Sequence, residues 1–475
     1  MKTATYCRKL ITLLLTVLMT LLLVACSTPA ATDNGTASAA EEGTAKKNNK
    51  SNDNANTDDN NDTGNRSAGN SGESSSDAAD AVKLDADELF TDRDLTQTPD
   101  LTGASEITVS DGKVIDIIEE GSYHITGTAA NCTIRVDAGV KDKVALVFDG
   151  VTVSNEDFPA VYVVSADKCF LTFLGTNSLS VTGEFRADGD TNTDAVIFSK
   201  DDLVLNGTGS VTVNSAKGNG VSCKDDLKIT GGTYTVTTAL DSFEANDSIA
   251  VKDGTFTITS SKDAFHSEDE DDYTAGYVYI GGGTFTITAT SDGIRGTTFV
   301  RIDGGTIKIT GREAIEATYV VINDGNLDLY GSDDGINASL KSKAYTTPAI
   351  VFNGGYTKVA VGSGDTDAID SNGDIYVNGG TIDVTSGISS FDYEYKAEFN
   401  GGTIIINGEQ VDSIPESMFG PGGFGGRGGQ FPGGGERPDG TNRPDGSNRP
   451  DGSGFPGGRK NRSGDDESPS EGSGV

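Results

Sequence analysis

The sequence contains few of the side chains on which most hydrolytic and zinc chemistry depends. Its 475 residues include two histidines, His124 and His266, and five cysteines. The histidines lie in different stretches without a His or Cys partner pattern, so Ser-His-Asp and zinc chemistry are poorly supported. The cysteines are also too few for a dense disulfide framework. We expect Cys132, Cys169 and Cys223 to be small buried residues, with one disulfide as the open alternative.

Positive charge is scarce as well. The chain has 36 Lys and Arg against 72 Asp and Glu, which gives a formal net charge of −36. Such a surface repels nucleic acid and anionic lipid, so both are excluded as binding partners. The excess of acids then has two explanations, which are solubility and the binding of cations by clustered carboxylates.

One long apolar run is present, and it lies at the N-terminus. "MKTATYCRKL" supplies basic residues, and "ITLLLTVLMTLLLVAC" ends on small residues, which predicts a secretory signal over residues 1–25. Leu23-Val24-Ala25-Cys26 resembles the bacterial lipobox, in which the cysteine is lipidated and becomes the new N-terminus; an uncleaved anchor is the alternative. We expect lipidation at Cys26, contact with the membrane through this lipid only, and a location on the extracellular face of the cell membrane.

Two segments have the composition of linkers. Residues 26–82 contain almost no large apolar side chains, so they cannot bury enough surface to offset the loss of chain entropy on folding. This composition predicts a disordered tether. Residues 413–475 are rich in Gly and Pro and carry the imperfect repeat "RPDGTNRPDGSNRPDG", which indicates a second disordered segment. A spacer is the simplest role for this tail, and a wall-interaction segment is the alternative.

The middle of the chain, residues 194–408, repeats at a period of about 21 residues. Each unit opens on an acid and contains three short alternating stretches separated by Gly or Asn turns, such as "TFTIT" and "TIKIT", which indicates three strands per unit. No segment has the 3.6-residue period of a helix, which excludes a helical solenoid, and a propeller blade needs about forty residues. The sequence therefore predicts an all-β parallel β-helix over residues 83–412, with residues 83–193 as an N-terminal cap (Leu84–Leu101) and looser coils.

Equivalent residues of stacked coils lie about 4.8 Å apart and form columns. One predicted column holds Asp241, Asp263, Asp292, Glu313, Asp334 and Asp367, and a second holds Glu244, His266, Arg295, Glu316, Asn337 and Asp370. Neighbouring carboxylates repel by roughly 1 kcal/mol in water and by more in the protein, so the acids must be protonated, separated or bridged by a cation. Calcium is the natural bridge, and solvated turn acids are the alternative. The predicted calcium ligands are Asp241, Glu244, Asp263, Asp292, Glu313, Glu316, Asp333, Asp334, Asn337, Asp365, Asp367 and Asp370.

Two coils carry insertions, in "SEDEDDYTAGY" after His266 and in "SLKSKAYTTPA" after Ala338. Insertions on one face of a solenoid commonly build its binding surface. Aromatic rings there could stack on sugars, and basic side chains could pair with the carboxylates of an acidic sugar; solvated loop residues are the alternative. The predicted carbohydrate-binding residues are Arg295, Tyr273, Tyr277, Tyr345, Lys341 and Lys343.

The stretch "ITVSDGKVIDIIEEGSYHITGT", the segment "IRVDAGVKDKVALVFDGVTVSN" and the later Asp-Gly-Ile coils resemble a family of bacterial carbohydrate-binding β-helix lipoproteins over residues 85–410. The resemblance implies a right-handed parallel β-helix that holds calcium and binds plant polysaccharide such as polygalacturonate. It also implies a fold similar to family 9 pectate lyases, which hold calcium with Asp-Asp-x-x-Asp and an acid from a neighbouring coil. Asp333-Asp334-Gly-Ile-Asn337 departs from that pattern at its last position, which favours a calcium site over a catalytic one.

We therefore expect a monomeric, extracellular, calcium-binding lipoprotein that binds an acidic, pectin-like polysaccharide. The alternatives are a calcium-dependent polysaccharide lyase and a wall-structural scaffold. A lyase needs a basic side chain to take the proton beside the uronate carboxylate. The candidates for this base are Arg295, Lys341, Lys343 and Lys396, and the sequence singles out none of them.

Overall fold

The computed structural model describes residues 84–269, 272–364 and 366–416. The predicted signal, the lipidation site Cys26, the tether, Asp365 and most of the Gly/Pro-rich tail lie outside the described residues. Within the described part of the chain, no helix is long and apolar enough to cross a membrane.

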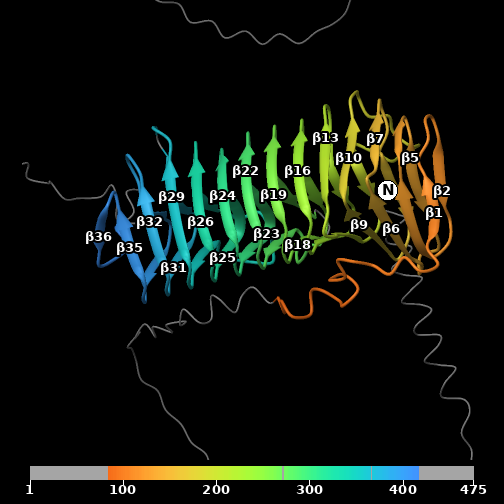
Figure 1. Ribbon diagram of the computed structural model, residues 1–475. Coiled ribbons are helices and arrows are strands. Elements are labelled where there is room, and N and C mark those ends of the chain that lie inside the picture. Colours follow the sequence, from red (N-terminus) through yellow and green to blue (C-terminus); the bar gives the residue numbers. More distant parts are fainter. Residues whose placement is uncertain (1–83, 270–271, 365, 417–475) are drawn as a thin grey trace, which may run out of the picture. The chain divides into compact units, whose positions relative to one another are not determined.

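The described residues form a parallel β-helix, in which three strands per coil stack into three columns along the solenoid (Figure 1). The first-strand column contains β2 (Val114–Ile117), β5 (Thr133–Asp137), β8 (Val161–Ser165), β11 (Ala195–Ser199), β14 (Asn219–Cys223), β17 (Phe243–Ala245), β20 (Phe265–Ser267), β23 (Ile294–Ile302), β25 (Ile315–Ile322), β27 (Ile336–Ala338), β30 (Ile369–Ser371) and β33 (Asp392–Tyr393). β23 and β25 continue without a break into the second column.

The second-strand column contains β1 (Ser105–Thr108), β3 (Gly121–Thr126), β6 (Lys143–Asp149), β9 (Lys168–Leu174), β12 (Leu203–Asn206), β15 (Asp226–Ile229), β18 (Ser248–Val251), β21 (Tyr277–Ile280), β28 (Ala349–Phe352), β31 (Asp374–Val377) and β34 (Lys396–Phe399). The third-strand column contains β4 (Thr128–Ala130), β7 (Thr152–Asn155), β10 (Thr176–Val181), β13 (Ser210–Ser215), β16 (Thr233–Thr238), β19 (Thr255–Ser260), β22 (Thr284–Ala289), β24 (Thr306–Gly311), β26 (Asn326–Gly331), β29 (Tyr356–Val361), β32 (Thr381–Thr385), β35 (Thr403–Ile406) and β36 (Glu409–Val411).

Neighbouring coils pair in parallel and in register, which confirms the predicted fold class and the three strands per coil. Phe243 lies opposite Phe265, and Ile294 lies opposite Ile315, so these coils are 22 and 21 residues long, as the repeat predicts. The last strand, β36, pairs antiparallel with β35 and ends the parallel stack.

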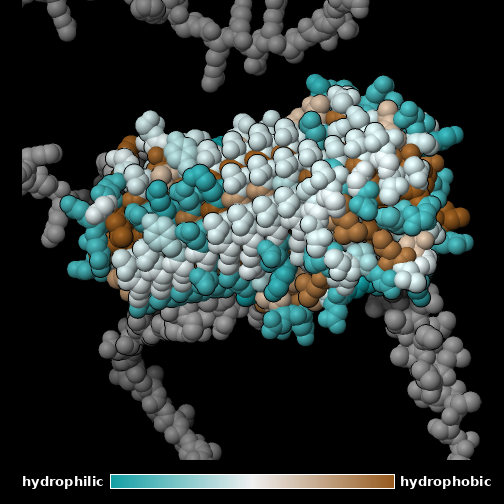
Figure 2. Space-filling view, viewed as in Figure 1, coloured by the Kyte–Doolittle hydropathy of each residue, from teal (hydrophilic) through white to brown (hydrophobic). Residues whose placement is uncertain are grey.

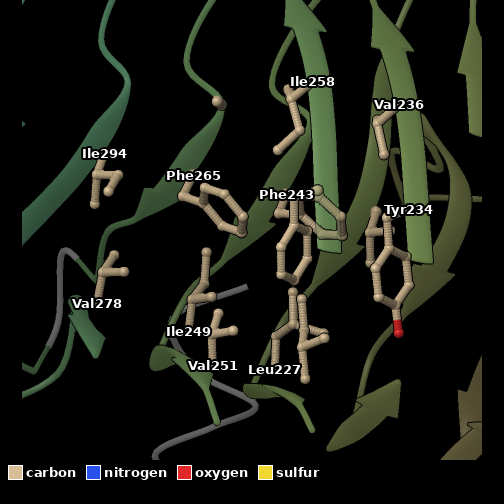
Figure 3. Close-up of a cluster of buried hydrophobic side chains, with 14 of the residues drawn as sticks. Leu227, Tyr234, Val236, Phe243, Ile249, Val251, Ile258, Phe265, Val278 and Ile294 are labelled. Carbon is tan, nitrogen blue, oxygen red and sulfur yellow. The ribbon is translucent and has the colours of Figure 1, made fainter. Parts of the chain in front are cut away.

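The core is a continuous stack of apolar side chains inside the coils. Phe256 lies between Tyr234 and Phe285, with ring centroids 5.1 and 4.6 Å apart. Phe243 and Phe265 form a second stack at 4.9 Å beside it (Figure 3). Stacked and edge-to-face rings add to the free energy that burial alone supplies. The ring stacks therefore match the spacing that strand pairing sets between the central coils.

The outward side of the third-strand column is rich in threonine. Residues of β16, β19 and β22 alternate between buried and exposed, and Thr235, Thr257 and Thr286 are opposite one another on the exposed side. Figure 2 shows this face as a broad pale surface of intermediate hydropathy. Cross-strand threonine pairs stabilise a sheet without exposing apolar surface.

Residues 84–101 do not cap the end of the solenoid, so that prediction is wrong. This segment, orange in Figure 1, runs along the side of the coils. The Leu84 carbonyl accepts a hydrogen bond from Arg301 on β23, and the Arg93 guanidinium lies 4.5 Å from the Phe170 ring on β9. The second-strand column points apolar rings outward, and the segment covers them.

Cys132, Cys169 and Cys223 are buried and form no disulfide, which confirms the expectation that they are small buried residues. Burial raises the pKa of the Cys169 thiol well above its usual value. These thiols therefore behave as small core residues.

The aromatic stack gives a direct test of the core. Replacing Phe256 with Ala removes a ring that touches four others, so the free energy of unfolding should fall by about 3–5 kcal/mol in urea titrations. Thr257→Ala, on the exposed side of the same strand, is the control and should change it by less than about 1 kcal/mol. Equal effects of the two changes would contradict the assignment of the inner face.

Candidate functional site

One column of side chains points outward from the first strand of every coil. It is called the outer column here and consists of Asp116, Arg135, Tyr162, Phe198, Ser222, Glu244, His266, Arg295, Glu316, Asn337, Asp370 and Asp392. Its neighbours along each strand, such as Phe243 and Ala245, lie in the core. The predicted second column is therefore correct in register and extends further in both directions than predicted.

The leading acids form a second column beside it, which is buried from Asp241 to Glu313 and half-buried at Asp334 and Asp367. The Asp263 N–H donates to Oδ1 of Asp241 at 2.9 Å, and the Asp292 N–H donates to Oδ1 of Asp263 at 2.8 Å. The Asp367 N–H donates to Oδ1 of Asp334 at 3.1 Å. Each of these carboxylates thus accepts a backbone hydrogen bond from the next coil. This bond stabilises the negative charge and ties adjacent coils at the corner.

Basic side chains neutralise the first part of this column. Lys262 Nζ lies 2.6 Å and His266 Nδ1 lies 3.4 Å from Oδ2 of Asp241, and His266 Nε2 lies 3.1 Å from Glu268. Burial opposes the charged form of His266, but hydrogen bonds to Asp241 and Glu268 raise its pKa to about 9. The ring is therefore a cation at neutral pH, which is unsuited to a metal ligand or a general base.

Asp292, Glu313 and Glu316 form a buried acidic group, with one oxygen of each within 4.8 Å of the others. Burial and repulsion by neighbouring acids raise the pKa of Asp292 to about 7 and of Glu313 to about 8. Burial also opposes ionisation of Glu316, but Lys341 at 2.6 Å and other positive charges hold its pKa below the usual value. Arg312 lies 3.0 Å from Asp292 and 2.6 Å from Glu313. This group therefore has positive side chains of its own.

Asp334 and Asp370, at the C-terminal end of the two columns, differ from these acids in their basic partners. Among the described residues, no salt bridge joins Asp334 or Asp370 to a basic side chain. Burial, with repulsion from neighbouring acids that include Asp367, raises the pKa of Asp334 to about 6 and of Asp370 to about 7. Between them lies Asn337, whose Oδ1 is buried without a hydrogen-bond partner in the described part of the chain.

Distances also separate the acidic groups. Within residues 84–269, 272–364 and 366–416, two groups of three His, Cys, Asp or Glu side chains have ligand atoms within 4.8 Å of one another. The first group is Asp241, Asp263 and His266, and the second is Asp292, Glu313 and Glu316. The acids around Asp334 are not such a group. With ligand distances of about 2.4 Å, calcium would require them to move closer together.

Both insertions lie at the same corner, between the first and second strands of their coils, and they contact each other. Ser342 Oγ donates to the Tyr273 carbonyl at 2.7 Å. Lys343 Nζ donates to the Tyr273 hydroxyl at 2.9 Å and lies 4.6 Å from the centre of its ring. The two insertions therefore form one raised edge beside the outer column.

The predicted carbohydrate-binding residues all have partners within the protein. The Tyr277 ring stacks on Phe299 at 4.7 Å, and the Tyr345 ring lies 5.0 Å from Tyr319, so both are partly buried supports of the insertions. Tyr273 is the most exposed of the three tyrosines, at 43%. Arg295 and Lys341 both contact Glu316, at 3.2 and 2.6 Å. Whether any of the six binds sugar stays a prediction.

Sequence reasoning missed the basic residues that accompany the leading acids. Lys262 and Arg312 each directly precede a leading acid, in "SKD" and "GRE", and this position was the available signal. It also missed a group of turn acids, Asp202, Asp225 and Asp247, which repeated "KDD" stretches at 200–202 and 224–226 could have revealed. Burial and repulsion, first by Asp247 and then by other acids, raise the pKa of Asp225 to about 7.

Comparison with known proteins places the chain in a family. Residues 111–367 match the model of the family described as carbohydrate-binding domain-containing protein. Because the match covers more than half of the chain, the protein belongs to this family.

The chain is similar to a curated protein and to a solved structure. A carbohydrate-binding domain-containing protein of Acetivibrio thermocellus is 35% identical over 126 residues, which are 26% of this chain and 44% of that protein, so the chain matches less than half of this relative. A solved structure of a polysaccharide lyase-like protein from C. thermocellum, as a gadolinium derivative, is 30% identical with a TM-score of 0.42, over 44% of this chain and 91% of that one.

The charged state of His266 predicts a pH-dependent contribution to stability. Its folded pKa of about 9 lies above the ordinary value of 6.5, so the contribution is full below pH 6.5 and is lost as pH rises through 9. His266→Gln should therefore lower the free energy of unfolding by on the order of 2 kcal/mol at pH 6, and by much less at pH 10. Urea titrations with chelator present measure this. A loss that is the same at both pH values would be inconsistent with a charged ring.

The turn acids give a prediction of opposite sign. The folded pKa of Asp225, about 7, lies above its ordinary value of 3.8, so stability is lost as pH rises from about 4 to 7, and the full cost is present above pH 7. Asp225→Asn should raise the melting temperature at pH 8 and leave it unchanged at pH 4. Asp412→Asn, at an exposed acid after β36, is the matched control and should leave the melting temperature unchanged at both pH 4 and pH 8. A melting temperature that falls at pH 8 would show that the carboxylate is stabilising.

Proposed function

We propose that the protein is an extracellular, calcium-binding lipoprotein that binds an acidic, pectin-like polysaccharide. The family match over residues 111–367 carries the carbohydrate-binding part of this proposal, and it includes both insertions and most of the outer column. The lipid anchor at Cys26 and the location on the outer face of the membrane rest on the predicted signal.

The outer column suits a long ligand that lies along the solenoid. It runs over twelve strands, a length of about 50 Å at the coil spacing of a parallel sheet. Five of its twelve side chains are buried, among them Tyr162 and Ser222, and the other seven are at least partly exposed. A polymer parallel to the axis would meet the partly exposed side chains in turn, and the raised edge around Tyr273 and Lys343 borders its path. This repetition favours a polysaccharide over a small molecule.

The calcium site is proposed at the C-terminal end, at Asp334, Asn337, Asp367 and Asp370. All four supply hard oxygen ligands of the kind that calcium prefers. Two observations support the fit. The Oδ1 of Asn337 is buried without a partner in the described part of the chain, and a bound cation would give it one. The pKa values of Asp334 and Asp370 are raised, and a bound cation would lower them by stabilising the carboxylates. When bound, the ion would neutralise these acids and offer open positions to the carboxylates of the polysaccharide.

The other predicted ligands support calcium less well. Asp241 and Asp263 lie beside Lys262 and the cationic His266, and Asp292 and Glu313 share Arg312. A divalent cation would have to displace or approach these positive charges.

No observation favours the lyase alternative. A base for proton abstraction must be free to approach the sugar. Arg295 and Lys341 contact Glu316 at 3.2 and 2.6 Å. Lys343 donates to the Tyr273 hydroxyl, and Lys396 lies 2.8 Å from Glu398. The proposal is therefore a binding protein.

Polygalacturonate binding tests the proposal. The mature chain should be retarded in gels containing polygalacturonate and calcium, and chelator should abolish the retardation. Absorbance from an unsaturated product should not appear at any time. Asp370→Asn should weaken calcium binding in titration calorimetry about tenfold or more, while the exposed control Asp412→Asn should not. Because Asp370 titrates near pH 7, calcium affinity should also be lower at pH 5 than at pH 8.

Two outcomes would contradict parts of this proposal. Retardation that survives chelator would exclude the calcium-dependent mode of binding. Accumulation of an unsaturated product would show that the protein is a lyase instead of a binding protein alone.

A further inference from the structure

A cavity of about 540 Å³ opens at the N-terminal end of the outer column. It lies where the outer column changes from acidic to aromatic and basic, at Arg135 and Tyr162 on the paired strands β5 and β8. Its volume falls in the range of pockets that bind small ligands. None of the predicted calcium or carbohydrate-binding residues lines it.

Val114 and Phe158 supply the accessible apolar surface of the cavity, and the Tyr162 ring, which is 1% exposed, packs against Phe158. Phe158 and Tyr162 pack edge to face, with centroids 5.6 Å apart. The guanidinium of Arg186 lies 4.3 Å from the centre of the Phe158 ring. The Tyr162 hydroxyl donates to Asp188 at 3.0 Å. Apolar surface beside fixed polar groups is the arrangement that recognises a sugar ring and its hydroxyls.

The wall that carries Arg186 and Asp188 is held in place before any ligand arrives. It is the connection between β10 and β11, and the Arg186 N–H donates to the Asp157 carbonyl at 2.8 Å. Thr193 Oγ1 donates to the Arg186 carbonyl at 2.8 Å, and Asp188 pairs with Thr191 across the turn. A preformed wall lowers the entropy cost of binding.

The charges that line the cavity do not favour an anion. Two arginines and three acids line the cavity, so the lining has a net charge of −1. Arg186 pairs with the lining acid Asp157, whereas Arg135 donates to Asp116 and Asp137 outside the lining. Guanidinium groups donate hydrogen bonds and carboxylates accept them, so together they match the hydroxyls of an uncharged sugar. A uronate would meet net repulsion here.

We propose that this cavity binds one uncharged glycosyl unit and is a second sugar site that does not need calcium. The inference rests on the carbohydrate binding proposed above, but not on the calcium site or on acidic sugars. It gives the aromatic end of the outer column a different ligand from the acidic end. A polysaccharide or mixed glycan could then contact both ends of the same column.

Titration of the mature chain with uncharged oligosaccharides tests the inference. The probes are cellotetraose, xylotetraose, mannotetraose and β-1,4-galactotetraose, each added to about 10 mM in chelator, with calorimetry or ligand-observed NMR as the readout. At least one should bind. Arg186→Ala, at a side chain 59% exposed, should weaken that binding about tenfold.

A second variant blocks the cavity instead of removing a contact. Val114 lines the cavity and is 58% exposed, so Val114→Trp should fill it and abolish binding without a change in melting temperature. Val140 is 61% exposed and does not line the cavity, so Val140→Trp is the matched control and should bind as the parent does. If none of the four probes binds, or if both cavity variants bind normally, the inference is wrong.

The two sites can fail separately. Asp370→Asn should leave the binding of the uncharged probe unchanged, and Val114→Trp should leave calcium-dependent retardation by polygalacturonate unchanged. Loss of retardation alone overturns the acidic-polysaccharide proposal, and loss of uncharged-probe binding alone overturns the cavity.

Discussion

The parallel hydrogen bonding between coils is the constraint on which the rest of the structure depends. It places residues one repeat apart in sequence at about 4.8 Å in space. Inside the coils this spacing is favourable, because rings such as Phe243 and Phe265 stack. Outside the coils the same spacing brings carboxylates together, which is unfavourable unless something compensates them. The chemistry of the outer surface therefore depends on how each coil compensates the repulsion between neighbouring carboxylates.

Three forms of compensation act along the solenoid, and one acid can have more than one of them, as Asp241 does. Backbone N–H groups of the next coil stabilise leading acids such as Asp241 and Asp263. Basic side chains, among them Lys262 and Arg312, neutralise the middle coils. At Asp334 and Asp370 no ion pair to a basic side chain is present within the described residues, and both pKa values are raised. A bound cation would stabilise the charged form of both carboxylates, which is why the calcium site is proposed there.

The repeat made much of the fold predictable. Its period gave the coils, the three strands and the register of Glu244, His266 and Arg295, because backbone pairing copies sequence spacing directly into space. The course of residues 84–101 was not predictable, because this segment has no repeat and follows exposed rings that only the folded coils create. The partners of Tyr277 and Tyr345 were equally hidden, since both rings pack on residues of other coils.

We propose that carbohydrate lies along the outer column. A crystal structure of the mature chain with calcium and an oligogalacturonate would test this. Sugar units should lie parallel to the solenoid axis, beside the first-strand column, with an ion between a sugar carboxylate and Asp334 or Asp370. Sugar bound instead on the threonine-rich face of β16, β19 and β22, or bound at the column without an ion at its acidic end, would contradict it.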